Sequence, residues 1–152
     1  MPNLNRKKID IKKVKMGKNV TIYSPSNIYE CEIGDNSFIG PFVEIQKGVK
    51  IGKNCKVQSH SFICELVKIK NNVFVGHGVM FINDKFKNYG PSNRNKKLWG
   101  KTEVGNQVSI GSNSTILPVK ICDNVVIGAG SVVTKNINKK GVYAGNPAKK
   151  IK

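Results

Sequence analysis

A six-residue repeat constrains this chain more than any other feature of its sequence. An unbroken apolar series runs through the middle of the chain: Ile33, Ile39, Ile45, Ile51, Val57, Ile63, Ile69, Val75 and Phe81. A small or β-branched residue follows each of the first eight members by four positions: Ser37, Val43, Val49, Cys55, Ser61, Val67, Val73 and Val79. The chain is 39% hydrophobic, so nine successive apolar positions in one register have a chance probability of about 2 in 10,000.

A period of six fits neither an α-helix nor a plain alternating strand. It predicts a short extended segment followed by a corner, and three such units close a triangular coil of about 18 residues. Glycine follows several lead residues, as at Gly34 and Gly52, where a corner needs freedom in φ. We therefore predict an all-β parallel β-helix whose stacked coils share one core. A β-sandwich of short strands is the alternative, but it has no reason to hold one register for so long.

The series continues on both sides of its centre, with two steps of five residues in place of six. These outer members predict roughly six coils in a single domain that covers residues 1–152: Met16, Ile22, Ile28, Val104, Ile110, Ile116, Ile121, Ile127 and Val133. The sequence shows neither a signal peptide nor an apolar stretch of membrane-spanning length. We therefore expect a cytoplasmic protein without a membrane partner.

The net charge of +17 raises the question of a polyanionic partner. Lysine is spread through most of the chain and no nucleic-acid-binding motif accompanies it, so we expect no nucleic-acid partner. A positive surface still favours phosphorylated small substrates. The four cysteines, Cys31, Cys55, Cys64 and Cys122, lack CxxC and Cys/His metal spacing, so we expect packed thiols and no metal.

Two segments depart from the repeat. The first, at about residues 83–101, is polar, basic and rich in turns, and we expect it to leave the prism as an external loop. Its apolar residues Phe86, Tyr89, Leu98 and Trp99 favour docking on a neighbouring subunit over a free, disordered loop. The second departure is the C-terminal tail, at about residues 134–152, which contains the sequence GNPAKKI.

The repeat, the external loop, and the segments GAGSVV and GNPAK resemble the hexapeptide-repeat acyltransferases. The segment KVQSHSFICELVKIKNNVFVGHGVMFIND is similar to bacterial N-acetyltransferases that act on the 3-amino group of nucleotide-linked sugars. This resemblance implies a left-handed β-helix and a homotrimer that binds acetyl-CoA between adjacent prisms. It also implies a role in making acetamido sugars for O-antigens, S-layers and other surface glycans, including lipopolysaccharide.

His60 is the candidate catalytic residue. An amine that attacks a thioester must lose a proton, so a nearby base is useful. His60 lies three residues after inward Val57 and one before inward Ser61, so we expect its side chain to point out of the prism. Several members of the resembled group carry asparagine at this position, so His60 acts either as a base or as a residue that orients the sugar. A surface histidine without a role is the remaining alternative.

The resemblance implies further site residues. Glu65 matches an acidic residue that helps to hold the sugar, and Asn83 and Asp84 are candidates for contacts to the sugar or its amine. His77 is a candidate because it follows His60 by almost one coil, and it is secondary because close members of the resembled group need not carry histidine there. For coenzyme A, the resemblance implies backbone contacts, a wall for the adenine end, and phosphate contacts along the last coils and the tail: Gly111, Gly128, Ala129, Asn146, Pro147, Ala148, Lys149 and Lys150.

The predicted reaction is acetyl-CoA-dependent N-acetylation of a dTDP-linked 3-amino-3,6-dideoxyhexose. A UDP-linked 3-amino sugar and O-acetylation within the same superfamily are the alternatives. A γ-type carbonic anhydrase shares the solenoid, but it needs three histidines for zinc and this chain has two. A non-catalytic scaffold has no reason to keep the loop, His60 and GNPAK together.

Overall fold

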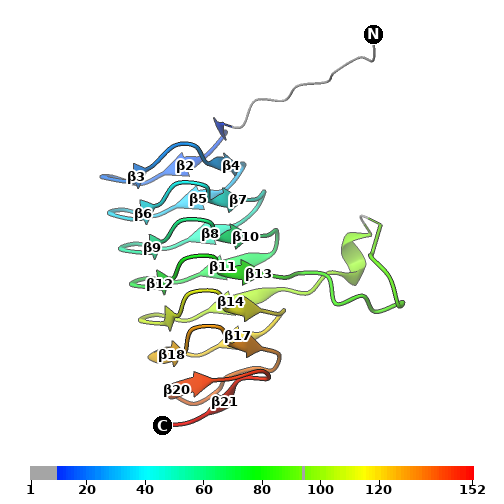
Figure 1. Cartoon of the computed structure of the whole chain (residues 1–152). Helices are drawn as coiled ribbons and strands as arrows, with labels where there is room; N and C mark the ends of the chain where they lie inside the picture. The colour runs from blue at the N-terminus through cyan, green and yellow to red at the C-terminus, as the bar shows by residue number, and fades with distance from the viewer. Residues whose placement is uncertain (1–9, 94) are drawn as a thin grey trace.

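The computed structural model describes residues 10–93 and 95–152, and it winds as a three-sided parallel β-solenoid (Figure 1). Each turn places one short segment in each of three sheets, and successive turns stack from the N-terminal to the C-terminal end. Strands pair in parallel throughout, except for the antiparallel hairpin of β20 and β21. This all-β architecture agrees with the β-helix expected from the sequence and from the resemblance.

We name the three sheets A, B and C. In chain order, sheet A contains β1 (Ile11–Lys12), β4 (Asn27–Tyr29), β7 (Glu44–Ile45), β10 (Phe62–Ile63), β13 (Met80–Phe81), β16 (Thr115–Ile116) and β19 (Val132–Val133). Sheet B contains β2 (Lys15–Met16), β5 (Glu32–Ile33), β8 (Lys50–Ile51), β11 (Val67–Ile69), β14 (Thr102–Val104) and β17 (Lys120–Ile121). Sheet C contains β3 (Thr21–Ile22), β6 (Phe38–Ile39), β9 (Lys56–Val57), β12 (Phe74–Val75), β15 (Ser109–Ile110), β18 (Val125–Ile127), β20 (Gly141–Ala144) and β21 (Lys149–Lys150).

The predicted inward series forms the core. All nine members from Ile33 to Phe81 are buried, and so are the eight residues that follow the first eight of them by four positions. Equivalent residues of successive coils stack directly, as in the pairing of Ile28 with Ile45 and of Ile45 with Ile63. From β4 to β19, each strand therefore contributes at least one buried residue to a column inside the prism, whereas Ile11 and Met16 at the N-terminal end are exposed.

The solenoid makes seven turns, against the roughly six expected. Sheet A has seven strands because Ile11–Lys12 begins an additional turn before Met16. At the other end, Ile137 bridges Ile121 in parallel and β20 adds to sheet C, which together complete the last turn. Ile11 and Ile137 each lie between two polar residues and outside the six-residue spacing, so the apolar pattern did not predict these end segments.

The chain turns between sheets at three edges, and most of these turns contain a residue with positive φ. The B–C edge carries Asn19, Asn36, Asn54 and Asn72, with φ between 54° and 57°. Their side-chain amides donate from one coil to the next, over 3.2 to 3.3 Å. Asparagine tolerates the left-handed region better than most residues, so this column suits the corner geometry.

Residues 83–101 leave the prism at the A–B edge, between β13 and β14, and we call this segment the arm. Figure 1 shows it projecting sideways from the middle of the solenoid. It contains the short 3-10 helix η1 (Lys96–Leu98). The prism resumes at Thr102, whose amide donates to the Leu66 carbonyl at 3.1 Å. The coils above and below the arm therefore remain stacked.

The B–C edge yields a prediction about stability. Replacing Asn54 with Ala places a Cβ-bearing residue without a local polar partner at positive φ, so we expect unfolding free energy to fall by about 1–2 kcal/mol. Asn54→Gly should cost less, because glycine adopts this conformation freely. Urea denaturation of both variants measures the difference, and an Ala variant as stable as the wild type would contradict this account.

Candidate active site

The C–A edge brings most of the predicted site residues into one column. It is formed by the pairs Pro41–Phe42, Ser59–His60, His77–Gly78, Ser112–Asn113 and Ala129–Gly130. The second member of each pair has positive φ, and its amide donates to the carbonyl of the first member one coil earlier. The distances are 3.2 Å for His60 to Pro41, 3.0 Å for Gly78 to Ser59 and 2.8 Å for Gly130 to Ser112. This ladder fixes the height of each side chain on the edge.

His60 lies at a corner of the coil and not on a strand. Its φ is 63° and its side chain is exposed, so the expected outward direction holds although the backbone is a turn. The imidazole stacks on Phe42 of the preceding coil, with ring centroids 4.8 Å apart and an interplanar angle of 14°. Among residues 10–93 and 95–152, neither ring nitrogen of His60 has a hydrogen-bond partner. The stacking on Phe42 therefore orients the His60 ring, and both ring nitrogens remain available for a ligand.

His77 has a different environment on the next coil. Its Nδ1 lies 2.9 Å from the Ser59 hydroxyl, and its backbone amide donates to the Ser112 hydroxyl at 3.2 Å. Both predicted histidines thus stand on the same edge, on successive coils. His77 is tied to its neighbours, whereas the His60 ring keeps both nitrogens available.

The glycines predicted to contact coenzyme A continue this edge toward the C-terminus. A Cβ on Gly111 would lie 2.4 Å from the Ala129 amide nitrogen, and one on Gly128 would lie 2.9 Å from the Ala144 Cβ. The close stacking of coils therefore requires both glycines, whatever else they do. Ala129 is exposed beside them, so a ligand can reach this part of the edge.

The GNPA segment of the tail lies at the same edge. The Val132 amide donates to the Gly145 carbonyl at 2.9 Å, and the Ala148 amide donates to the Val132 carbonyl at 2.8 Å. Asn146 and Pro147 are exposed between these two contacts. Lys149 and Lys150 follow in β21 and are also exposed. The tail thus extends the column that begins at His60.

Glu65, Asn83 and Asp84 lie at the opposite edge of sheet A. Strand β10 separates Glu65 from His60, and five residues of extended chain span at most about 17 Å. The Asn83 side-chain amide donates to the Glu65 carbonyl at 3.3 Å, which connects the start of the arm to the prism. Within one chain, the predicted site residues therefore form two groups, one at each edge of sheet A.

Asp84 organises the arm. Its carboxylate accepts hydrogen bonds from the Ser92 amide at 2.7 Å and the Phe86 amide at 2.9 Å. These backbone donors lower the pKa of the Asp84 carboxyl below its ordinary value. The Trp99 indole donates to the Ser92 hydroxyl at 2.6 Å, which closes the network. Both Asp84 oxygens thus have partners inside the arm.

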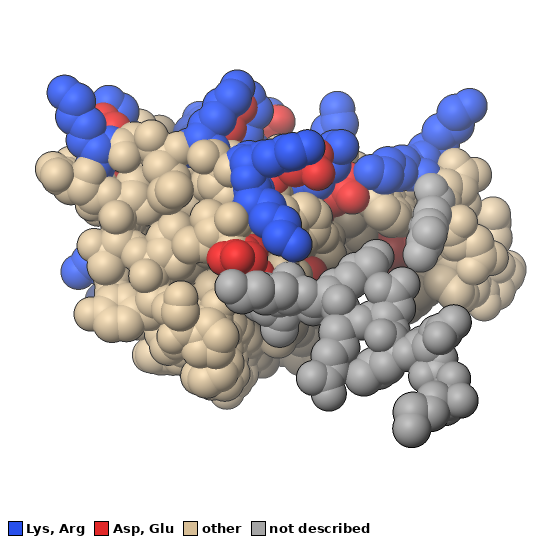
Figure 2. Space-filling model, turned by 90° about the horizontal axis from the view of Figure 1, so that it is seen from above, with Lys and Arg blue, Asp and Glu red and all other residues tan. Residues whose placement is uncertain are grey.

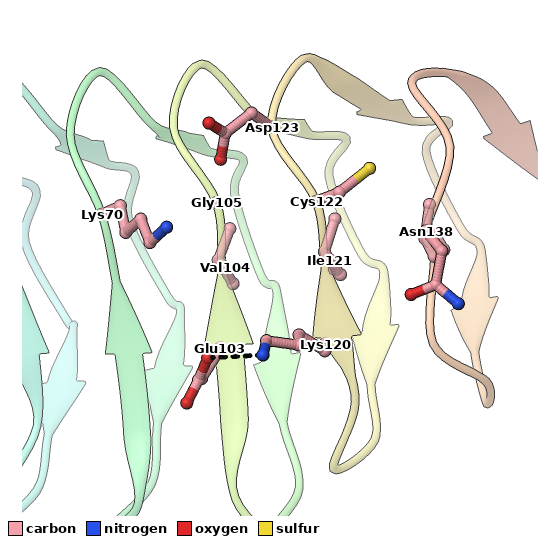
Figure 3. Close-up of a pocket in the computed structure, with 10 residues that line it drawn as sticks. Lys70, Glu103, Val104, Gly105, Lys120, Ile121, Cys122, Asp123 and Asn138 are labelled. Atoms are coloured by element: carbon pink, nitrogen blue, oxygen red, sulfur yellow. Dashed lines mark ion pairs between the residues drawn. The ribbon is translucent and has the colours of Figure 1, made fainter.

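A separate hollow lies on sheet B near the C-terminal end and contains none of the predicted site residues (Figure 3). Glu103 and Lys120 form an ion pair of 3.6 Å on its wall. Asp123 accepts a hydrogen bond from the Asn106 amide at 2.7 Å, which lowers the pKa of its carboxyl. Because none of the predicted site residues lines this hollow, the C–A edge remains the better candidate site.

Sequence reasoning missed two partners of the site. Phe42 stands 18 residues before His60, which is one coil, so the repeat alone could have paired them. Lys96, which pairs with Glu65, had no such signal because the arm lies outside the repeat. In the described part of the chain, no three His, Cys, Asp or Glu side chains are grouped so as to hold a metal ion. Nor does that part contain a helix long and apolar enough to cross a membrane.

Two profiles of hexapeptide transferases match the chain. "Bacterial transferase hexapeptide (six repeats)" matches residues 30–65, and "Hexapeptide repeat of succinyl-transferase" matches residues 101–135. The matched segments lie on either side of the arm and coincide with regular coils of the solenoid. The chain belongs to the hexapeptide-repeat acyltransferases.

Two solved structures that resemble this chain contain bound coenzyme A. A mutant of AntD, an N-acyltransferase from Bacillus cereus in complex with dTDP and coenzyme A, is 28% identical with a TM-score of 0.80. That alignment covers 91% of this chain and 82% of AntD. A galactoside acetyltransferase in complex with coenzyme A is 26% identical with a TM-score of 0.58, over 93% of this chain and 64% of that one.

The bifunctional protein GlmU of Wigglesworthia glossinidia brevipalpis is 38% identical over 144 residues, which is 86% of this chain and 30% of GlmU. GlmU of Streptococcus uberis is 32% identical over 90% of this chain and 31% of its own length. The chain therefore spans about a third of the length of these curated relatives.

We expect the three buried thiols, Cys31, Cys55 and Cys64, to be poor nucleophiles, which can be tested directly. Burial raises the pKa of Cys64 to about 12 and that of Cys31 to about 11, and it also raises the pKa of buried Cys55. At about pH 8 these thiols stay protonated, so we expect iodoacetamide to modify Cys122 alone in the native protein. Mass spectrometry before and after denaturation measures this, and rapid native labelling of Cys64 would refute it.

Proposed function

We propose that the chain is a cytoplasmic, acetyl-CoA-dependent N-acetyltransferase that acetylates the 3-amino group of a dTDP-linked 3-amino-3,6-dideoxyhexose for surface glycan synthesis. The observation that carries the proposal is the C–A edge, where an exposed, unpaired His60 stands in line with Ala129 and the GNPA segment. The similarity to AntD, whose structure contains dTDP and coenzyme A, supports the choice of nucleotide and cosubstrate.

The proposed chemistry follows from the position of His60. The sugar amine attacks the carbonyl carbon of the thioester, so a C–N bond forms and the C–S bond breaks. His60 accepts the proton that the amine loses, and the leaving thiolate takes up a proton to give free coenzyme A. Because Phe42 stacks on the imidazole, the ring is already oriented before the reaction begins. It therefore loses less orientational freedom when the transition state forms.

Coenzyme A would lie along the C–A edge below His60. Exposed Ala129 leaves room for the pantetheine arm, and Gly111 and Gly128 keep the edge narrow there. Asn146, Pro147 and Ala148 would border the adenine end. Lys149 and Lys150, both exposed at the end of the column, would attract phosphate.

The charge distribution supports a homotrimer. Each strand of sheet B has one charged residue that faces outward, and these residues form a row along the sheet: Lys15, Glu32, Lys50, Lys68, Glu103 and Lys120. Figure 2 shows lysines and acidic residues gathered along one side of the molecule. The corresponding rows of sheets A and C are mostly uncharged, and they expose Met80, Phe74 and Val126 by 39–44%. The two faces that flank the C–A edge are thus the ones suited to contact other prisms.

A trimer would also resolve the separation of the two groups of site residues. His60 and the arm lie at opposite edges of sheet A within one chain, so they would meet at a groove between neighbouring copies. In this arrangement the arm of one copy covers the C–A edge of the next. The exposed Phe86 and Tyr89 at the end of the arm would then have a surface to contact.

The acceptor preference tests the proposed function. We expect thiol release from acetyl-CoA to be fastest with a dTDP-linked 3-amino-3,6-dideoxyhexose, slower with a UDP-linked 3-amino sugar and absent with galactosides. The assay needs a colorimetric thiol reagent and product masses. Faster O-acetylation of a galactoside would instead assign the chain to the O-acetyltransferases.

Replacing His60 tests its role in proton transfer. We expect His60→Ala to lower kcat by about 100-fold, because the amine then loses its base. The KM for acetyl-CoA should change little, since the cosubstrate would lie mainly below this coil. Steady-state kinetics across pH measures both parameters. A rate near that of the wild type with an unchanged pH profile would eliminate His60 as the base.

A further inference from the structure

The arm has an internal framework of its own. Asp84 bonds the Phe86 and Ser92 amides, and the Trp99 indole bonds the Ser92 side chain. An antiparallel bridge pairs Asp84 with Trp99 at its base. The arm is therefore a shaped element whose orientation depends on where it is fastened to the prism.

Glu65 provides that fastening. Its carboxylate forms an ion pair with the Lys96 ammonium, and its side chain is only 20% exposed. The same ammonium lies 5.5 Å from the centre of the Trp99 ring, so it contacts both the prism and the arm framework. The Glu65 carbonyl also accepts the Asn83 amide. Two independent contacts thus join Glu65 to the arm.

Glu65 is held firmly from the prism side. Its backbone amide donates to the Gln46 side-chain oxygen at 3.2 Å, and the Gln46 amide donates to Glu44 at 3.0 Å. The neighbouring cation on this edge, Lys47, is paired with Glu30 at 2.9 Å. Lys96 pairs with Glu65, and because the Glu65 side chain is only 20% exposed, water screens this ion pair less than one in which both side chains are fully exposed.

We propose that Glu65 is a positioning residue that acts through Lys96 and the arm, and does not itself bind the sugar. The ion pair aims the arm so that its exposed apolar end, with Phe86 60% exposed and Tyr89 fully exposed, closes the acceptor site of a second copy. This role rests on the proposed function. The attachment of the arm to Glu65 does not depend on that function, because it follows from the Lys96 ion pair and the Asn83 hydrogen bond alone.

Trp99 is the chain's single tryptophan, so its fluorescence reports on the arm alone. We expect Glu65→Gln and Lys96→Met each to increase acrylamide quenching of Trp99 by about twofold, because the arm detaches locally. Both variants should raise the KM for the acceptor by about tenfold and change kcat less. The double variant should be no worse than either single one, because both remove the same contact.

Lys97→Met is the matched control, because Lys97 is exposed on the same 3-10 helix and its neighbour Lys96 forms the ion pair. This variant should behave as the wild type in both measurements. The exchanged pair Glu65→Lys with Lys96→Glu should recover part of the lost affinity for the acceptor. A structural defect in the prism would not be rescued in this way.

Two outcomes would overturn the proposal. If Glu65→Gln raises the acceptor KM while Lys96→Met leaves both KM and Trp99 quenching unchanged, Glu65 contacts the substrate directly. If neither variant changes the quenching, the ion pair does not hold the arm. Should the wild type turn over none of the proposed acceptors, the proposed function fails, but the quenching still decides whether Glu65 fastens the arm.

Discussion

Backbone stacking between successive coils is the constraint on which the rest of this structure depends. At each edge, an amide in one turn donates to a carbonyl in the neighbouring turn, so a residue's height along the prism follows from its place in the sequence. This requirement explains the left-handed residues at the corners and the glycines that permit close approach, such as Gly111. It also explains why chemically different residues, from Phe42 to Gly130, can share one edge without changing the backbone.

The same stacking separates two histidines that look alike in the sequence. His77 has serine side chains on its own edge within reach, at the ring and at the backbone, so its ring is already engaged. His60 meets an aromatic face instead, which orients the ring without occupying its nitrogens. This difference is the reason that the role of base is proposed for His60 and not for His77.

The six-residue pattern predicted most of the fold, because each inward residue is dictated by burial in a narrow prism. It predicted the core from Ile33 to Phe81, the position at which the arm leaves, and the outward direction of His60. It could not show that His60 occupies a corner, because the apolar pattern marks inward positions and gives no dihedral angles. The Glu65 to Lys96 contact was also beyond it, because residues 83–101 follow no period and their partners depend on three-dimensional folding. The pattern did not predict the seventh turn, because the step from Val133 to Ile137 is four residues and the step from Ile11 to Met16 is five, so neither keeps the six-residue period.

The base of the arm has a consequence for how such a protein can diversify. The Gly100 amide donates to the Asn83 carbonyl at 2.8 Å, so the chain departs from the prism and returns to it at nearly the same point. An insertion whose ends meet adds no strain to the coils it interrupts, and its length and content can change while the core stays as it is. Natural selection can therefore alter the arm, and with it the contacts that we propose for it, independently of the stacked coils.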